Sequence, residues 1–205
     1  MVDTDRSRKL ESAASDITPK TLEAAKSAIA FCCEEHLRWS DLFLERLETI
    51  SDPNLPKFTR ALCLTMLGHL PTRPETCPFC IQYGRDRECR GCGYALTHGR
   101  CDEDVSAFSR FIESFQELGR AIYQETSKPA SDPAQTRVIL QEVIYASIRE
   151  ARRMTCKLEN ASALDLMEQK SRYLKRMICL LPLELFSPEV GERYRMVEGS
   201  LEDYW

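Results

Sequence analysis

Apolar residues recur every three or four positions over most of this chain, a spacing that places them on one face of an α-helix. The first strong pattern begins after Thr18-Pro19, which pairs a good N-cap with proline at the first helical position. It continues through Ile50 and ends at the turn-forming run 51–54. A further helix is predicted from Pro56 to Leu70, before two prolines stop helix formation.

The second half of the chain carries four more helical patterns. One is predicted to open at the acidic run 102–104, and it holds the clearest amphipathic stripe: Val105, Phe108, Phe111, Ile112, Phe115, Leu118 and Ile122. Asp132 precedes Pro133 and caps the next helix. Ser162 with Asp165 resembles a capping box, and a short helix is predicted after Ser187. We therefore predict an all-α bundle of six or seven helices, with at most a small hairpin in segment 77–101.

We expect residues 1–16 to form a flexible polar arm, and residues 17–205 to form a single helical domain with an insert at 77–101. The N-terminus has no apolar run typical of a secretory signal, and no segment approaches the length of a membrane span. Ten cysteines in such a chain indicate a reducing compartment. We expect a cytoplasmic protein with no membrane partner, and the net charge of −4 gives no global reason to expect nucleic acid.

Half of the cysteines lie close together in the insert, and they are the most informative residues of the chain. Cys77-Pro-Phe-Cys80 and Cys89-Arg-Gly-Cys92 form two C-x-x-C pairs, and Cys101 follows. Each pair suits a tight turn that aims two sulfurs at one metal ion, so we predict that these four cysteines share a metal. Cys101 and His98 are further candidate ligands, which gives more donors than a structural zinc site uses.

The segment 77–96 resembles the short zinc ribbon of many prokaryotic proteins, which has a Cys-Pro-x-Cys knuckle and a later Cys-x-x-Cys-Gly. The resemblance implies Zn²⁺ as the cofactor, and it implies a positive φ at Gly93 after the second pair. The segment departs from the ribbon at Ile81, where Gly is usual, and at Glu88, where an apolar residue is usual. Cys101 and His98 have no place in a plain ribbon, and a [4Fe-4S] cluster held by four thiolates is the alternative.

The other cysteines lie in helical patterns beside apolar residues, so we interpret them as small core residues: Cys32, Cys33, Cys63, Cys156 and Cys179. His36 and His69 lie on helices without a ligand partner, and we interpret them as structural.

No segment resembles a phosphate loop, a dinucleotide fingerprint, a nucleophile elbow or a helical carboxylate pair, so we lean against an enzyme. We predict a metal-binding accessory or regulatory protein that docks onto a protein partner through its zinc-stabilised loop and the flanking helices. The candidate partner-binding residues are Arg85, Arg87, Arg90, Tyr204 and Trp205. Packing of Trp205 onto the helical core is an equal alternative to partner binding by the C-terminal tail. Binding of nucleic acid by the loop arginines is a less favoured alternative to their binding of a protein.

Overall fold

The computed structural model describes residues 4–84, 89–126 and 132–205, and these residues form nine α-helices and no strand. The all-α prediction is therefore confirmed, with more helices than the six or seven expected. The bounds of the helices are α1 Thr4–Ser15, α2 Pro19–Thr49, α3 Leu55–Gly68, α4 Pro78–Tyr83, α5 Gly93–His98, α6 Ala107–Gln124, α7 Pro133–Leu158, α8 Ala163–Cys179 and α9 Pro188–Tyr204.

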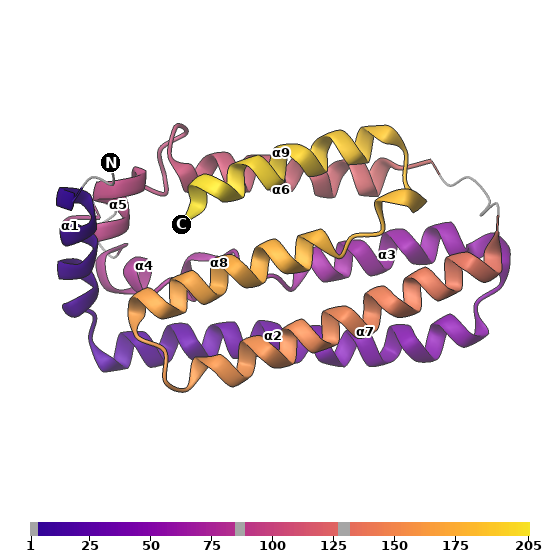
Figure 1. Cartoon of the computed structure of the whole chain (residues 1–205), viewed down its shortest axis with the longest axis horizontal. Helices are drawn as coiled ribbons and strands as arrows, with labels where there is room; N and C mark the ends of the chain where they lie inside the picture. The colour runs from indigo at the N-terminus through magenta and orange to yellow at the C-terminus, as the bar shows by residue number, and fades with distance from the viewer. Residues whose placement is uncertain (1–3, 85–88, 127–131) are drawn as a thin grey trace.

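The long helices run side by side along the longest axis of the molecule (Figure 1). α2 packs on α7 and α6 packs on α9, while α3 and α8 make contacts with both pairs. The three remaining helices, α1, α4 and α5, gather at one end of the bundle, where both chain termini also lie (Figure 1). We call this part, comprising α1 and residues 74–84 and 89–106, the cysteine end.

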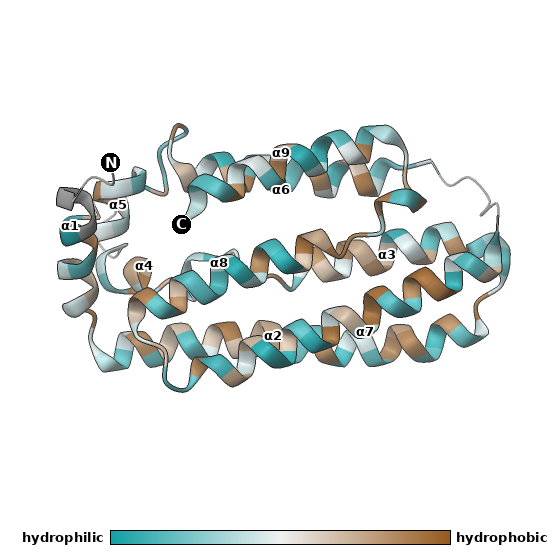
Figure 2. Ribbon diagram, in the orientation of Figure 1, coloured by the Kyte–Doolittle hydropathy of each residue, from teal (hydrophilic) through white to brown (hydrophobic). Residues whose placement is uncertain are grey.

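The interior between the long helices is one continuous apolar core, to which all six of them contribute. Its completely buried side chains include Ile29, Leu55, Phe111, Leu118, Leu140, Ile144 and Leu174. Figure 2 shows polar and apolar residues interspersed along the long helices, as expected for helices with one buried face. Each fully buried side chain of this size contributes roughly 1.5–3 kcal/mol relative to exposure, so this core is the main source of stability.

Three predicted caps are present with hydrogen bonds to the first turn of their helices. Thr18 accepts a hydrogen bond from the Thr21 amide at 3.2 Å, at the start of α2. Asp132 accepts one from the Gln135 amide at 3.1 Å, at the start of α7. The Ser162 and Asp165 pair forms a complete capping box at the start of α8. These caps satisfy amides that have no partner inside the helix.

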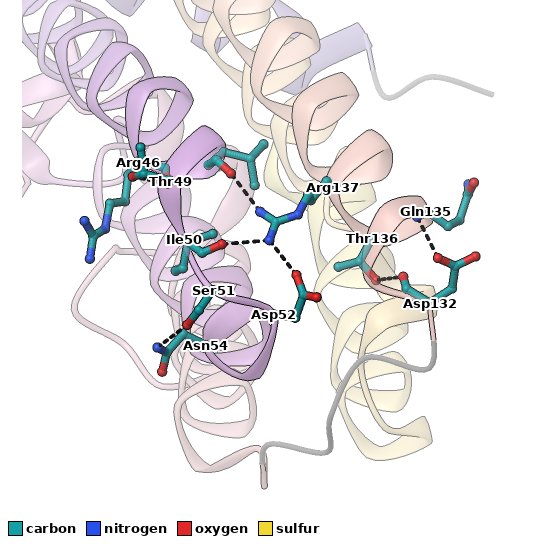
Figure 3. Close-up of polar contacts among 11 residues, drawn as sticks. Arg46, Thr49, Ile50, Ser51, Asp52, Asn54, Asp132, Gln135, Thr136 and Arg137 are labelled. Carbon is teal, nitrogen blue, oxygen red and sulfur yellow. Dashed lines mark hydrogen bonds and ion pairs between the residues drawn. The ribbon is translucent and has the colours of Figure 1, made fainter.

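An arginine clamp fixes the end of the bundle opposite the cysteine end. The Arg137 guanidinium on α7 donates hydrogen bonds to the carbonyl oxygens of Leu47, at 2.9 Å, and Ile50, at 2.7 Å. It also pairs with Asp52 at 2.6 Å (Figure 3). The last carbonyls of α2 lack partners within the helix, so Arg137 both satisfies them and ties α2 to α7.

Several sequence-based boundaries are wrong. The predicted N-terminal arm contains helix α1, with Ala13 buried in the cysteine end. The cysteine segment, for which we expected a loop with at most a small hairpin, holds two short helices, α4 and α5, among its described residues. α6 starts at Ala107 behind the N-cap Ser106, not at the acidic run 102–104, which leaves Val105 82% exposed. The final helix, predicted to be short, spans 17 residues.

No helix in the described part of the chain is both long enough and apolar enough to cross a membrane.

Candidate metal centre

Two short helices position the first four cysteines of the segment. Cys77 is the N-cap residue of α4, and Cys80 lies within this helix, one turn further on. Cys92 is the N-cap residue of α5, where its sulfur accepts a hydrogen bond from the Ala95 amide at 3.5 Å. Cys89 precedes that cap with a positive φ of 50°, an uncommon conformation for a residue with a side chain. The two C-x-x-C motifs therefore form tight turns, as the sequence predicts.

The segment is fixed to the rest of the protein by close backbone packing at Gly93. A Cβ atom at this position would lie 2.7 Å from Ala13 Cβ and 3.0 Å from Leu10 Cα, both on α1. Gly93 is needed for this approach and not for a positive φ, so the conformational expectation from the zinc-ribbon resemblance is wrong. The positive φ values of this turn belong to Cys89, at 50°, and Gly91, at 78°.

All five cysteines of the segment belong to one apolar cluster at the cysteine end. Cys77 and Cys92 are buried in it, and the others are half-buried. The cluster is completed by residues of the surrounding helices: Ala13 of α1, Phe79 of α4, Tyr94 of α5 and Met167 of α8. The fold thus brings together sulfurs from three separate stretches of the segment.

The five thiols differ in which of the others they lie next to. Cys80 interacts directly with both Cys101 and Cys77, which places Cys101 inside the group and not beyond it. Cys92 lies near Cys77 and Cys89. Cys77, Cys80 and Cys101 therefore form an inner group, and Cys92 joins this group to Cys89.

The environment of Cys77, Cys80 and Cys92 favours the protonated form of these three thiols. Hydrogen bonding to Cys101 and burial together raise the pKa of Cys80 to about 12. Hydrogen bonding to Cys80, followed by burial, holds the pKa of Cys77 well above its usual value. Burial raises the pKa of Cys92. A soft metal ion that bound here would displace these protons, because the thiolate is the ligand form of cysteine.

A lysine side chain faces the inner group from α8. Lys170 is only 1% exposed, and its ammonium donates a hydrogen bond to the Thr76 carbonyl oxygen at 3.4 Å. Burial lowers the pKa of Lys170, while the charges of Cys77, Cys80 and Cys101 oppose that change. Sequence analysis missed this residue. Its signal was available, since Lys170 lies at helical spacing from Leu166, Tyr173 and Leu174 on the buried face of α8.

Aromatic rings cover the cysteine cluster on the side of the C-terminus. The His98 ring stacks on Tyr94 with centroids 4.5 Å apart, and Trp205 lies parallel to both rings at 6.1 Å from Tyr94 and 6.0 Å from His98. The Thr97 hydroxyl contacts His98 Nδ1 at 2.6 Å. The structure therefore places His98 in an aromatic stack, and its role as a metal ligand stays a prediction.

The chain end packs inward. Tyr204 is 1% exposed and contacts Phe111 with ring centroids 5.1 Å apart, and its carbonyl oxygen accepts a hydrogen bond from the Tyr94 hydroxyl at 3.0 Å. Trp205 is half-buried. This placement favours the fold-back alternative for the tail over a free docking peptide. Among the other candidate partner-binding residues, Arg90 is exposed, and Arg85 and Arg87 lie outside the described residues.

Solvent reaches the inner group beside Cys101. A pocket of about 470 Å³ is lined by Cys101, Asp104, Phe108, Ser109, Ile112, Glu113 and Gln116. The side chain of Cys101 is half-buried and contributes to the wall of this pocket, so a small ion in solution has a short path to the sulfur.

The donor set fits a soft metal. Sulfur is the preferred ligand for zinc and for iron–sulfur clusters, and five cysteines share one shielded cluster. In the described residues, however, no three or more His, Cys, Asp or Glu side chains are arranged to hold a metal ion. The convergence of Cys77, Cys80, Cys89 and Cys92 on one ion thus stays a prediction.

The five cysteines outside the segment differ in their exposure, and they fall into three classes. Cys33 and Cys63 are buried in the bundle core, as predicted. Cys156 and Cys179 are exposed, so their interpretation as core residues is wrong. Cys32 is half-buried and is among the groups whose charge acts on Lys170, which places it near the inner group.

Comparisons with known protein families, with curated proteins and with solved structures found no match to this chain.

Proposed function

We propose that this protein is a metal-binding accessory or regulatory protein whose cysteine end holds a thiolate-bound metal. The observation that carries the proposal is the gathering of five cysteines in one apolar cluster at the end of a helical bundle. Core packing alone does not account for it, because this segment is largely composed of polar residues, Gly and Arg. A bound metal would join α4, α5 and the turn at Cys101, which are short elements.

Zinc is the first candidate for this metal, and a [4Fe-4S] cluster is the second. Two tight C-x-x-C turns favour zinc, since they resemble zinc knuckles. The interaction of Cys101 with Cys80 favours the cluster, because it indicates a ligand set drawn unevenly from the segment. Both centres use four thiolates, and both leave one of the five cysteines over.

A protein partner is the second part of the proposal. α2 carries large apolar side chains that point to solvent: Phe31 is 63% exposed, Leu42 is 49% exposed and Trp39 is 38% exposed. Phe31 and Leu42 lie three helical turns apart on the same side of the helix. Apolar side chains along an exposed helix face suit an interface with another protein.

The metal is tested by purifying the full chain without air and measuring its elements and its visible spectrum. One zinc per chain and no colour support the zinc centre, while iron, sulfide and a brown colour support the cluster. The double variant Cys77→Ser, Cys80→Ser should lose the metal, and the exposed-site control Cys156→Ser should keep it. Wild-type protein that contains neither metal, and takes up neither on reconstitution, contradicts the proposal.

The partner is tested by placing a photo-crosslinking residue at Phe31 in the native host. We expect one discrete crosslinked protein from this position. The matched control is Tyr123 on α6, which is 74% exposed but lies on a different helix. Equal crosslinking from both positions would indicate random collision, and it would remove α2 as the docking surface.

A further inference from the structure

Lys170 is a buried cation that pairs with no carboxylate in the part of the chain that the structure describes. Its side chain is 1% exposed, and no Asp or Glu of the described residues forms an ion pair with it. The ammonium can donate three hydrogen bonds, but with the described residues it makes one, of 3.4 Å, to the Thr76 carbonyl oxygen. The ring of Tyr204 lies 5.9 Å from the nitrogen and adds a weak cation–π contact. These contacts leave most of the cost of burying a charge uncompensated.

The groups around this ammonium that can become anionic are thiols. The groups whose ionisation would stabilise the Lys170 ammonium are Cys77, Cys80, Cys101 and Cys32, in that order. The first three are the inner group of the candidate metal centre, and the carbonyl that accepts the Lys170 hydrogen bond belongs to the residue preceding Cys77. Lys170 therefore reaches the inner group from helix α8, next to the residue that precedes Cys77.

Metal binding changes the charge of this site. Each thiol that becomes a ligand loses its proton to solvent, and four thiolates outweigh the charge of a divalent ion. The resulting centre is anionic and shielded from water, so it needs a nearby cation. Lys170 is buried beside the inner group of thiols. Without a metal, a neutral side chain of similar length at this position would avoid the free-energy cost of burying a charge.

We propose that Lys170 is the counter-ion of the metal centre, and that its ammonium balances the negative charge of the metal-bound thiolates of Cys77, Cys80 and Cys101. This inference rests on the proposed metal-binding function. It assigns Lys170 a positioning and charge-balancing role, and it predicts opposite effects of neutralising Lys170 in the two states of the protein. The metal-bound state loses a favourable interaction, whereas the metal-free state loses a desolvation cost.

The test measures Zn²⁺ affinity by competition with a chromophoric chelator, using the full-length metal-free chain and the variant Lys170→Met. We expect the affinity of the variant to fall about 10- to 100-fold, as for other residues that support metal ligands from outside the coordination shell. We expect the melting temperature of the metal-free variant to equal or exceed that of the wild type. Co²⁺ should give the same thiolate charge-transfer bands in both proteins, because the ligands are unchanged.

The matched control is Lys175→Met, which removes the same charge from an exposed position of the same helix. Its Zn²⁺ affinity should stay within about twofold of the wild type, since solvent screens an exposed charge. If Lys170→Met does not fold, Lys170→Gln removes the charge and keeps a donor for the Thr76 carbonyl.

The outcomes separate this inference from the function on which it rests. Wild-type protein that binds neither Zn²⁺ nor Co²⁺ overturns both. Wild-type binding with equal affinity in Lys170→Met overturns only the counter-ion role, as does an equal loss of affinity in Lys175→Met. A metal-free Lys170→Met or Lys170→Gln protein with a lowered melting temperature shows a structural role for Lys170 and also overturns the inference.

Discussion

The bundle and the cysteine end of this protein are stabilised in different ways. The bundle has one continuous apolar core formed by six long helices, and its polar contacts mostly cap or tie helix ends. The cysteine end has three short helices around a smaller cluster, in which cysteines replace many of the aliphatic residues of an ordinary core. The same chain thus combines a region that apolar packing alone can stabilise with a region whose cysteine side chains are suited to binding a metal.

This difference indicates where function lies. Burial of aliphatic side chains is sufficient for folding of the bundle. Few residues of the bundle therefore need a functional explanation. At the cysteine end, the burial of a lysine costs free energy that packing does not require, and the thiols beside it are the ligand atoms that soft metals prefer. Such features are typical of functional sites, and they occur together here.

The largest expected effect comes from Tyr204, which joins the two regions. Its ring packs on Phe111 of the bundle, and its carbonyl oxygen is bonded to Tyr94 of the cysteine end. Tyr204→Ala should lower the free energy of unfolding by about 3–5 kcal/mol, measured by urea denaturation, because it leaves a large cavity. Tyr123→Ala, at an exposed site, should change it by less than about 0.5 kcal/mol. Equal small effects in both variants would mean that the chain end does not connect the regions.

The attachment of α1 to the cysteine end is tested at Gly93. Gly93→Ala places a Cβ atom 2.7 Å from Ala13 Cβ, so α1 must shift, and we expect a loss of about 1–3 kcal/mol. Faster hydrogen exchange should be confined to α1 and α5. The control Gly119→Ala on α6 meets no atom within 4 Å and should stabilise the protein by about 0.4–1 kcal/mol. A neutral Gly93→Ala would show that α1 does not pack closely there.

The bundle has its own titratable weak point at His36. Burial, with a smaller effect of His69, lowers the pKa of His36 from 6.5 to about 4. The unfolded chain therefore takes up a proton first as pH falls, and stability decreases between pH 6.5 and pH 4. We expect a loss of about 2 kcal/mol between pH 7 and pH 5, measured from urea midpoints. His36→Gln should flatten this slope, and an unchanged slope in that variant would assign it to other groups.

The smallest expected effect comes from a helix cap next to the boundary between the regions. Ser162→Ala removes the side-chain acceptor of the Asp165 amide and should cost about 1 kcal/mol, seen as a lower melting temperature. Metal content should not change. The control is Ser15→Ala, at an exposed residue whose hydroxyl donates a hydrogen bond to the Ser12 carbonyl oxygen of its own helix. The melting temperature of this control should change less than that of Ser162→Ala. A loss of metal in Ser162→Ala would indicate that the start of α8 supports the metal centre directly.

The sequence predicted the bundle well because its signals are local. Apolar spacing and N-caps at Thr18, Asp132 and Ser162 depend on a few neighbouring residues, and the structure confirms them. Helix α1 was missed because its only apolar residues are Leu10, Ala13 and Ala14, and it is held by contacts with α5 that no local pattern reveals.

The cysteine end was predicted only in part. Spacing alone identified the cysteines, since the C-x-x-C turn is a local feature. The place of Cys101 beside Cys80, the role of Gly93 and the burial of Lys170 all depend on contacts between distant segments. A lysine at an apolar helical position was the one local sign of the buried charge.

The most direct measurement of the central proposal is X-ray absorption at the metal edge of anaerobically purified full-length protein. We expect a first shell of sulfur atoms at about 2.3 Å, and the loss of the bound metal in the double variant Cys77→Ser, Cys80→Ser. A first shell made only of oxygen or nitrogen, or an identical spectrum in the double variant, would contradict a thiolate metal centre at the cysteine end.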